Sequence, residues 1–441
     1  IVIQNAVTKG LNPNVPMKNS GVDWIGDIPE HWQMKRLKYV LDERNERSKT
    51  GEEPLFMVSQ KYGLVVRADY HEKAEVAQSN IDNKIVYKND LVFNKLKPHL
   101  GVFYKSEIDF KGLVSPDYAV YKVKNYIYDM KYLELLFRNP KYIEQFIIRA
   151  TGIVEGLIRL YTTELFELPV MIPPREEQEK ILNFLHGKTA QIDQAIALKQ
   201  QQIEKLGEYK QIVIQNAVTK GLNPNAPMKD SGVAWIGDIP EHWNVIRFRN
   251  AFRFNKGLNI TKENLNDEQG ILCLNYGEIH SKYGFEFIPN VHPLKFVDES
   301  YLKNNQKSLL NDGDFVFADT SEDIEGSGNF SYINGQDLVF AGYHTLIAKP
   351  KINFNSRFIA YVLDSSAFRN QVRLRVKGVK VFSITQAILK TTFIWLPTEQ
   401  EQNEIVKYLD EKMQKFNNAK IAYQIQIDRL KEYKNILINQ A

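Results

Sequence analysis

Side chains that could bind nucleic acid gather in the turns of this chain. Lys and Arg can neutralise phosphates or bind guanine, and Asn and Gln match the edge of adenine. The first half offers an amide, cations and a ring, in Gln60, Lys61, Tyr62, Asn94, Lys95, Lys97 and His99. The second half offers a comparable set: Asn275, Tyr276, Thr320, Ser321, Tyr343, His344, Arg373, Arg375, Lys377 and Lys380. Each residue alone could equally be a turn former or a surface charge, so the prediction of DNA contact rests on the sets.

Part of the second set lies in a basic stretch, Ser365–Thr398, which contains no acid. A solvated, lysine-rich face is the alternative interpretation of such a stretch. The formal net charge of the whole chain is only +4, which is too small to diagnose a nucleic-acid binder.

Motifs for catalysis are absent from the sequence. There is no GxxxxGK[ST] phosphate loop, no CxxC pair and no HExxH, so we predict neither a motor ATPase nor a zinc site, and no catalytic or metal-binding residue. Asn139-Pro-Lys-Tyr142 is similar to the (D/N)PP(Y/F) motif of amino-methyltransferases but lacks the second proline. We interpret it as a helix break.

The main organising feature is a 32-residue block that occurs twice, at 1–32 and 212–243, with three differences. The segment 177–217 also aligns without gaps with 401–441. The order of parts is therefore connector, variable block, helix, repeated once, and joining the ends would close it into a ring. Residues 1–10 repeat the end of the first long helix, so they either extend or complete the helical pair or reflect a permuted start.

Apolar residues alternate at spacings of three and four through both repeated helical segments, which is the pattern of a coiled-coil seam. A helix of about 40 residues is roughly 60 Å long and cannot be buried within one block. We predict that the two long helices pair antiparallel. The alternative is that each helix packs on its own block.

The blocks between the repeats differ in sequence but keep landmarks in the same order. Asp90–Asn94 matches Asp314–Ala318, and helical stretches follow at 130–149 and 356–371. Short β-branched and aromatic runs between Gly, Asn and Asp turns predict mixed, β-rich α/β recognition domains. The fold class is thus α/β with two long antiparallel coiled-coil helices, in a pseudo-twofold, circular arrangement of two half-repeats.

The predicted boundaries follow from the repeats. They are a connector at 1–32, a variable domain at 33–173, a central helix at 174–220, a second connector at 221–243, a second variable domain at 244–396 and a C-terminal helix at 397–441. The single Cys273 excludes an internal disulfide and suits a reducing cytoplasm. No apolar run is long enough for a membrane helix, and no secretory leader is visible.

The connector AVTKGLNPN-PMK-SG-WIGDIPEHW, the helix entry P-x(3,4)-EQ and the helix exit LKEYK resemble the specificity subunit of type I restriction–modification systems. The resemblance covers the whole chain. It implies a non-catalytic, bacterial or archaeal cytoplasmic subunit in which each variable domain reads half of a split DNA target and the paired helices set the spacer. The implied partners are double-stranded DNA, two methyltransferase subunits and restriction–translocase subunits. S-adenosylmethionine, ATP and Mg²⁺ would act in those partners, and this chain would hold no cofactor.

Duplicated connectors imply two equivalent docking places for one type of partner. The candidate docking residues are Trp24, Ile25, His31 and Trp32, with Trp235, Ile236, His242 and Trp243 in the second copy. For the His-Trp pairs, packing or docking is expected rather than catalysis. Two other function classes remain open: a methyltransferase or nuclease with its own recognition domains, and a pure protein-interaction adaptor.

Overall fold

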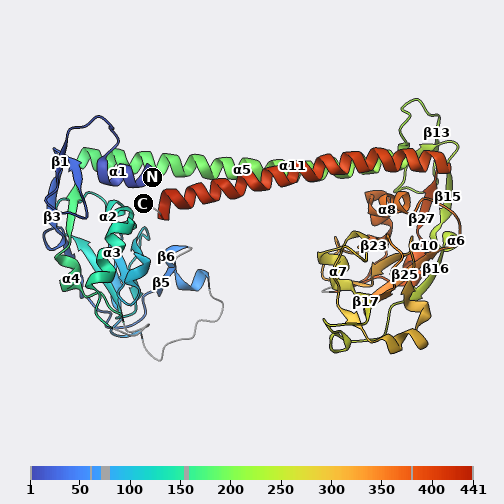
Figure 1. Cartoon of the computed structure of the whole chain (residues 1–441), viewed down its shortest axis with the longest axis horizontal. Coiled ribbons are helices and arrows are strands. Elements are labelled where there is room, and N and C mark those ends of the chain that lie inside the picture. The colour runs from blue at the N-terminus through green and yellow to red at the C-terminus, as the bar shows by residue number, and fades with distance from the viewer. Residues whose placement is uncertain (1, 60–61, 71–79, 153–157, 379–380, 440–441) are drawn as a thin grey trace. The chain divides into compact units, whose positions relative to one another are not determined.

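The chain forms two compact units, each with its own cores (Figure 1). Unit 1 comprises Ile1–Gln200 with Gln424–Ala441, and unit 2 comprises Gln201–Tyr423. The computed structural model describes residues 2–59, 62–70, 80–152, 158–378 and 381–439. Two long helices, α5 (Arg175–Lys220) and α11 (Glu399–Asn439), each contribute to both units.

Unit 1 is built on an antiparallel four-stranded sheet of order β4-β11-β8-β9. These strands are β4 (Leu41–Glu43), β11 (Tyr118–Val123), β8 (Leu91–Asn94) and β9 (Phe103–Lys105). The described residues of unit 1 form four further antiparallel pairs: β1 (Met17–Asn19) with β2 (Asp27–Pro29), β3 (Gln33–Arg36) with β12 (Pro169–Ile172), β5 (Phe56–Ser59) with β6 (Gly63–Val66), and β7 (Lys84–Val86) with β10 (Gly112–Val114). Its short helices are α1 (Val2–Lys9), α2 (Met130–Leu136), α3 (Pro140–Arg149) and α4 (Thr162–Phe166).

Unit 2 carries a larger sheet of order β16-β25-β21-β23-β18. Its strands are β16 (Phe252–Lys256), β25 (Thr345–Pro350), β21 (Phe315–Ala318), β23 (Phe330–Ile333) and β18 (Phe285–Phe287). A second sheet has the order β19 (Phe296–Val297), β17 (Ile271–Leu274), β24 (Val339–Ala341) and β20 (Leu309–Leu310). The remaining pairs are β13 (Met228–Asp230) with β14 (Asp238–Pro240), β15 (Asn244–Arg247) with β27 (Phe393–Leu396), and β22 (Thr320–Ser321) with β26 (Phe382–Ser383). The short helices are α6 (Phe248–Ala251), α7 (Tyr276–Ser281), α8 (Ser356–Asp364), α9 (Ser366–Arg373) and α10 (Gln386–Thr391).

The aspartates that precede the two matched strands in the sequence make equivalent hydrogen bonds in both units. Asp90 precedes β8 and accepts a hydrogen bond from the Tyr87 backbone N–H, and Asp314 precedes β21 and accepts one from Asn311. Burial raises the pKa of both carboxyls, although Arg44 pairs with Asp90 and Lys349 with Asp314. The apolar residues that follow them form a continuous run, so both faces of each central strand are buried.

Both predicted helical stretches are interrupted. Asn139 caps α3 by accepting a hydrogen bond from the Lys141 backbone N–H, and Pro140 occupies the first turn, so Asn139-Pro is a helix break as predicted. The stretch predicted at 356–371 is two helices rather than one. The Ser365 backbone is extended and its Oγ accepts a hydrogen bond from the Phe368 N–H, which starts α9 as a new helix.

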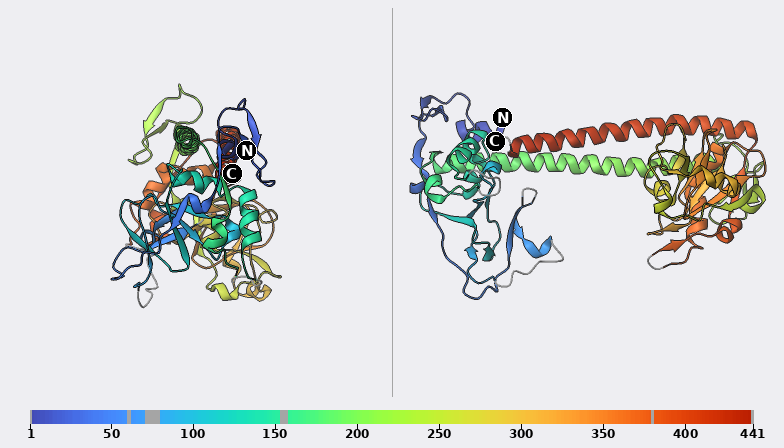
Figure 2. Two further views of the ribbon diagram at one scale, coloured as in Figure 1. Left: turned by 90° about the vertical axis from the view of Figure 1, so that its left-hand side faces the viewer. Right: turned by 60° about the horizontal axis from the view of Figure 1, so that its bottom comes forward.

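The two long helices lie beside each other in each unit (Figures 1 and 2). In unit 1, Lys434 Nζ of α11 is 2.7 Å from Asp193 Oδ2 of α5. In unit 2, the rings of Tyr209 and Phe416 meet edge-on with centroids 5.6 Å apart. Within unit 1, α1 packs against α2, and the Tyr132 hydroxyl donates to the Val7 carbonyl.

Each connector is fastened to the start of a long helix by one carboxylate. Trp32 Nε1 donates to Glu177 Oε2 at 3.0 Å, and His31 Nε2 lies 2.6 Å from the same oxygen. Trp243 and His242 repeat the arrangement on Glu401, at 3.1 and 2.8 Å. The helix α1 ends just before Gly10, and two facts require glycine there. Its φ is +78°, and a Cβ at this position would lie 2.6 Å from Glu177 Oε1. This explains why the repeated Gly, His-Trp and Glu residues occur together.

Candidate nucleic-acid interface

In unit 1 the predicted contact turn follows β8 and is held rigidly. Asn94 Oδ1 accepts a hydrogen bond from the Leu96 backbone N–H, so this side chain shapes the turn. Gly101 has a φ of +58° and packs so closely on Ile143 of α3 that a Cβ would lie 2.6 Å away. Lys97 and His99 remain exposed between these two anchors. The turn therefore presents cations from a fixed backbone.

Lys95 is the most distinctive member of this turn. Its side chain is half-buried and forms no ion pair with any described residue. Burial, and then the neighbouring Lys84 ammonium, lower the pKa of Lys95 below its usual value. A phosphate placed beside Lys95 would offset both effects, because a neighbouring negative charge favours the protonated ammonium.

The other predicted set in unit 1 is only partly described. Tyr62 is 47% exposed, and its ring lies 4.6 Å from that of Tyr70. Gln60 and Lys61 lie outside the described residues. Both rings of this pair are exposed, and sequence reasoning had found only Tyr62.

In unit 2 one predicted contact is contradicted. Asn275 is 1% exposed and caps α7 in a reciprocal arrangement with Glu278. Its Nδ2 also donates to the Cys273 carbonyl at 3.2 Å. The amide is therefore used inside the protein, where a helix needs its first N–H groups satisfied, and it is not available to a base edge.

Three of the other predicted residues converge. Tyr276 meets Tyr343 and His344 edge-on, with ring centroids 5.6 and 5.3 Å away. His344 is exposed, has a φ of +54°, and places Nδ1 3.2 Å from Asp319 Oδ1. This aromatic group borders a cavity of about 510 Å³ lined by Tyr276, Gly277, His280, Thr320, Ser321, Glu322, Asp323, Gly326, Asn329 and Val381. Of the predicted pair Thr320 and Ser321, Ser321 is itself buried.

His280 and Asn329 are site residues that sequence reasoning missed. His280 Nε2 lies 2.8 Å from the Thr320 carbonyl oxygen, and Asn329 Nδ2 lies 2.9 Å from His280 Nδ1. Arg369 donates to Asn329 Oδ1 at 2.8 Å and to Asp364 at 2.9 Å. The Thr320 carbonyl oxygen can only accept, so His280 Nε2 donates to it and Nδ1 accepts from the Asn329 amide. No local pattern joins these residues, because they come from distant segments.

The basic stretch of unit 2 is more neutralised than its sequence indicates. Arg373 donates to the Glu325 carbonyl oxygen at 2.7 Å, with the Glu325 carboxylate 3.6 Å away. Arg375 is exposed, but its Nη1 donates to the Gln371 carbonyl. Lys377 is exposed, and Lys380 lies outside the described residues. Although the basic stretch contains no acidic residue, acidic side chains from outside it pair with its arginines. The prediction of DNA contact is weakened most for Arg373.

The structure divides the predicted docking residues of the connectors. Trp32 and Trp243 are fully buried, and Ile236 is 5% exposed, so a direct docking role for these three is contradicted; they hold the connector in place. His31 and His242 are exposed but bound to Glu177 and Glu401. Trp235 is 46% exposed, whereas Trp24 and Ile25 are half-buried and line a cavity of about 220 Å³. Packing therefore explains the His-Trp pairs, and a docking role for the exposed Trp235 stays a prediction.

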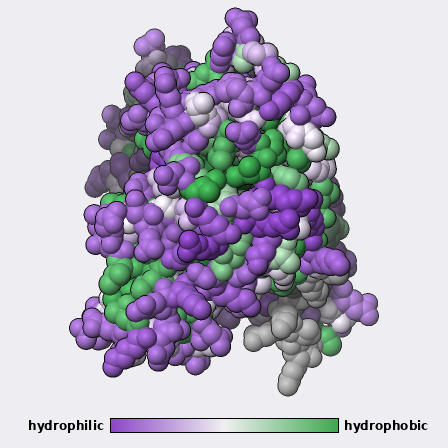
Figure 3. Space-filling view, turned by 90° about the vertical axis from the view of Figure 1, so that its right-hand side faces the viewer, coloured by the Kyte–Doolittle hydropathy of each residue, from purple (hydrophilic) through white to green (hydrophobic). Residues whose placement is uncertain are grey.

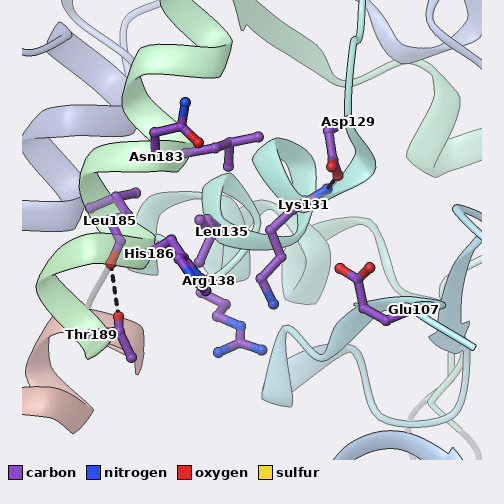
Figure 4. A pocket seen from close by; sticks show the side chains of 10 residues that line it. Glu107, Asp129, Lys131, Leu135, Arg138, Asn183, Leu185, His186 and Thr189 are labelled. Atoms are coloured by element: carbon purple, nitrogen blue, oxygen red, sulfur yellow. Dashed lines mark hydrogen bonds between the residues drawn. The ribbon is translucent and has the colours of Figure 1, made fainter. Parts of the chain in front are cut away.

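The junctions between the recognition domains and the long helices have diverged. In unit 1 a cavity of about 390 Å³ separates α2 from α5, and Lys131, Arg138 and Glu107 point into it (Figure 4). In unit 2, Arg357 of α8 closes the junction by binding Glu286 at 2.7 Å and Asp410 of α11 at 2.8 Å. Burial alone would lower the pKa of Arg357, but its hydrogen bonds to Asp410 and Glu286 raise it.

Several large apolar residues on the long helices are exposed, a feature that the heptad pattern does not predict. In unit 1 they are Leu198, Ile425 and Tyr433, and in unit 2 they are Tyr209, Ile212 and Ile421. Exposed apolar side chains on a helix are suited to contact with another protein.

Within the described residues, no three His, Cys, Asp or Glu side chains gather as a metal site. In the same residues, no helix is both long and apolar enough to cross a membrane. Cys273 is buried, and this burial raises the pKa of its thiol to about 12.

Two β-rich domains with different polar surfaces on repeated connectors define a class of modular recognition proteins. Comparisons with known proteins place the chain within this class. The family model for the type I restriction modification DNA specificity domain matches residues 29–208 and 240–426. The chain belongs to this family.

Individual relatives agree with this assignment. The chain is 26% identical over 399 residues to the type I restriction enzyme MjaVIII specificity subunit of Methanocaldococcus jannaschii, covering 87% of this chain and 86% of that protein. A solved chain of a type I restriction–modification system is similar in fold, with a TM-score of 0.60 and 16% identity over 93% of this chain and 97% of that one. The HsdS subunit of Thermoanaerobacter tengcongensis matches over the same shares, with a TM-score of 0.50 and 16% identity.

Proposed function

We propose that this chain is the DNA specificity subunit of a type I restriction–modification system. It reads a bipartite, asymmetric target in double-stranded DNA with two recognition domains, and it holds methyltransferase and restriction subunits. It has no catalytic activity of its own. The family match to two separate segments, one per unit, supports one reader in each unit.

The proposal rests on one contrast: the connectors are fastened in the same way in both units, whereas the candidate DNA-contact surfaces differ. The Trp–His–Glu fastening is the same in both units to within 0.2 Å in each contact. The candidate contacts differ: unit 1 presents Lys95 and Lys97 from a rigid turn, and unit 2 presents an aromatic group beside a polar cavity. Different donors and acceptors select different bases, so the two half-sites differ and the whole target is not a palindrome.

The long helices are proposed to form an antiparallel coiled coil that sets the unread spacer. Within unit 2, Tyr209 faces Phe416 and Gly221 faces Glu401, so residue numbers rise along α5 as they fall along α11. The pair Asp193–Lys434 in unit 1 has the matching register. These contacts support a pseudo-twofold, circular order of two half-repeats.

Two methyltransferase subunits are proposed to bind, one for each connector and helix start, with restriction–translocase subunits joining for cleavage. S-adenosylmethionine, ATP and Mg²⁺ would be bound by those partners. The exposed apolar residues of α5 and α11 offer surface for such assembly.

The direct test is to map methylated bases in cells that express the chain with its methyltransferase partner. The variant Lys95→Ala/Lys97→Ala should weaken or change one half-site and leave the other readable, because both lysines belong to the unit 1 reader. Each lost phosphate contact should also reduce the salt dependence of DNA binding by a slope of about 1. Lys88→Ala/Lys124→Ala is the matched control, since both lysines are in unit 1 and exposed but paired with Asp109 and Asp42.

Two results would contradict the proposal. Equal degradation of both half-sites would show that the readers are not separate. Methyl transfer from labelled S-adenosylmethionine to DNA by the purified chain alone would show that it is an enzyme.

A further inference from the structure

Two glutamines at the starts of the long helices are buried. Figure 3 shows hydrophilic side chains, in purple, over much of one face of unit 2, and glutamine ordinarily belongs to such a surface. Gln178 of α5 and Gln402 of α11 are instead only 1% and 4% exposed. A buried amide needs hydrogen-bond partners, because leaving its donors and its acceptor unpaired costs stability. The partners of these two amides therefore show what the glutamines do.

Gln178 joins the start of α5 to the recognition domain of unit 1. Its Oε1 accepts a hydrogen bond from the Tyr128 backbone N–H at 3.0 Å, and its Nε2 donates to the Tyr126 carbonyl at 2.8 Å. The same Nε2 donates to the carbonyl of Pro173, just before the helix, at 2.9 Å. Tyr126 and Tyr128 belong to the segment between β11 and α2. The amide thus uses both of its N–H groups and its oxygen to hold that segment on the helix start.

Gln402 makes the equivalent connection in unit 2. Its Oε1 accepts a hydrogen bond from the Asn355 backbone N–H at 2.8 Å, and its Nε2 donates to the Pro397 carbonyl at 3.0 Å. Asn355 is the N-cap of α8, and Asp129, the residue after Tyr128, is the N-cap of α2. Each glutamine directly follows the glutamate that fastens the connector. At each helix start, therefore, the Glu side chain holds the connector and the Gln side chain holds the recognition domain.

In unit 2 the recognition domain has further polar contacts with its long helix. Arg357 Nε of α8 lies 2.8 Å from Asp410 Oδ1 of α11, and the Tyr361 hydroxyl donates to the same oxygen at 2.6 Å. These contacts lie about two helical turns beyond Gln402. Gln402 is thus one of several polar contacts that hold this domain in place.

In unit 1 the three equivalent positions line the cavity of about 390 Å³ between α2 and α5 (Figure 4). Counting from the N-caps of α2 and α8, and aligning α5 with α11, gives these positions as Lys131, Leu135 and His186. Lys131 pairs with Glu134 of its own helix at 2.6 Å. Within the described residues, Gln178 therefore carries a larger part of the polar connection in unit 1 than Gln402 does in unit 2.

We propose that Gln178 and Gln402 are positioning residues that fix the orientation of each recognition domain on its long helix, and that unit 1 depends on its glutamine more strongly. This inference rests on the proposed function, because the orientation of a reader decides which spacer between the half-sites is accepted. A domain that turns on its helix can reach a half-site displaced by one base pair. Loss of a contact that holds the domain raises the population of such orientations.

The test measures methylation by the full chain with its methyltransferase subunits, on DNA targets whose spacer is native, one base pair shorter or one base pair longer. Spacer discrimination is the ratio of the rate on the native spacer to the rate on an altered one. The variants are Gln178→Met and Gln402→Met, which keep the length of the side chain and remove its hydrogen bonds. Gln194→Met and Gln414→Met are the matched controls, because these glutamines are exposed on the same two helices. Thermal unfolding of every variant is measured alongside.

We expect Gln178→Met to lower spacer discrimination by about tenfold, which corresponds to the net loss of one or two hydrogen bonds. Gln402→Met should lower it by no more than about threefold, because the contacts of Asp410 remain. Adding Asp410→Asn to Gln402→Met should bring the loss up to that of Gln178→Met. The two control variants should keep the discrimination of the wild-type chain.

The contacts of unit 2 can also be built into the cavity of unit 1. Lys131→Arg/Leu135→Tyr/His186→Asp should restore discrimination to the Gln178→Met chain. In a chain that keeps Gln178, the same three substitutions should raise discrimination above that of wild type. This last variant gives a result even if Gln178→Met does not fold.

Each result bears on a separate part of the inference. Wild-type discrimination in folded Gln178→Met, or in the chain with the three substitutions and an intact Gln178, would overturn the positioning role alone. An equal loss of methylation on all three spacers, together with a lower melting temperature, would also overturn it, because that is the effect of a purely structural residue. Equal losses in Gln178→Met and Gln402→Met would overturn the difference between the units. A wild-type chain that directs no methylation to any split target would overturn the proposed function as well.

Discussion

At the scale of single residues, the ion-pair network around Arg357 links three elements of unit 2. Arg357 of α8 contacts Glu286 of β18 and Asp410 of α11, and the Tyr361 hydroxyl also donates to Asp410. Burial raises the pKa of Glu286, but hydrogen bonds from Arg357 and Asn334 outweigh it and hold that pKa below its usual value of 4.5. The recognition domain of unit 2 is thereby tied to the long helix by charge.

This network predicts acid sensitivity in unit 2. A carboxyl whose folded pKa is lowered adds stability above its unfolded pKa, and that stability is lost as the pH falls through the folded pKa. Glu286→Gln should therefore destabilise β18 and α8 by about 1–2 kcal/mol at pH 7, where a hydrogen bond to a charged partner is lost. The difference from wild type should shrink as the pH falls below 4.5. Hydrogen exchange in these two elements, measured across that range, is the check; a difference that persists at low pH would rule out the ionised carboxylate as its cause.

Individual residues also show which parts of the candidate site could be predicted from the sequence. It placed Lys95 and Lys97 in a presented turn because the turn is local and its residue types are diagnostic. It misassigned Asn275, because an amide that caps a helix and an amide that reads a base look the same in sequence. It could not find His280, whose partners Asn329 and Thr320 are brought to it by the sheet. Local chemistry was predictable, and contacts between distant segments were not.

At the scale of elements, repetition allowed the long helices and connectors to be predicted. The helices begin at Arg175 and Glu399, after the prolines that the sequence marked as helix starts. The strands within each domain were harder to predict, because many have only two to four residues and their partners are remote in sequence. Thus the constant parts could be foreseen in detail and the readers only as β-rich domains.

If the proposed coiled coil sets the spacer between the half-sites, its length should determine the length of the spacer. One heptad inserted between Gln200 and Gln201 of α5, with another between Tyr423 and Gln424 of α11, preserves the paired faces and adds about 10 Å of helix. At about 3.4 Å per base pair, the spacer between the methylated half-sites should grow by about three base pairs with both half-sites unchanged. Insertion into α5 alone is the control and should impair assembly, since it puts the two helices out of register. An unchanged spacer in the doubly lengthened chain would exclude the ruler.

At the scale of the whole molecule, each recognition domain is a cassette. In unit 1 the first and last strands of the block pair directly, with Gln33 opposite Ile172. In unit 2, Asn244 lies opposite Leu396 in the same way. Because each block enters and leaves through one two-stranded sheet, its interior can change while the connector and the helix start keep their geometry. This arrangement explains how one scaffold supports two unlike readers.

Cassettes of this kind predict that the target can be rewritten by exchange. Replacing residues 244–396 with a second copy of 33–172 keeps the β15–β27 entrance as a β3–β12 entrance, so we expect the chain to fold and to bind its methyltransferase partner. Both readers would then have the chemistry of the Lys95 turn. If the half-repeats are related by a pseudo-twofold axis, methylation should move to a symmetric target made of two inverted copies of the unit 1 half-site. Mapping methylated bases in cells tests this, with the reciprocal exchange as the control for the unit 2 half-site. Two direct rather than inverted copies would show that the half-repeats are arranged head to tail, and survival of the original asymmetric target would show that recognition lies outside the blocks.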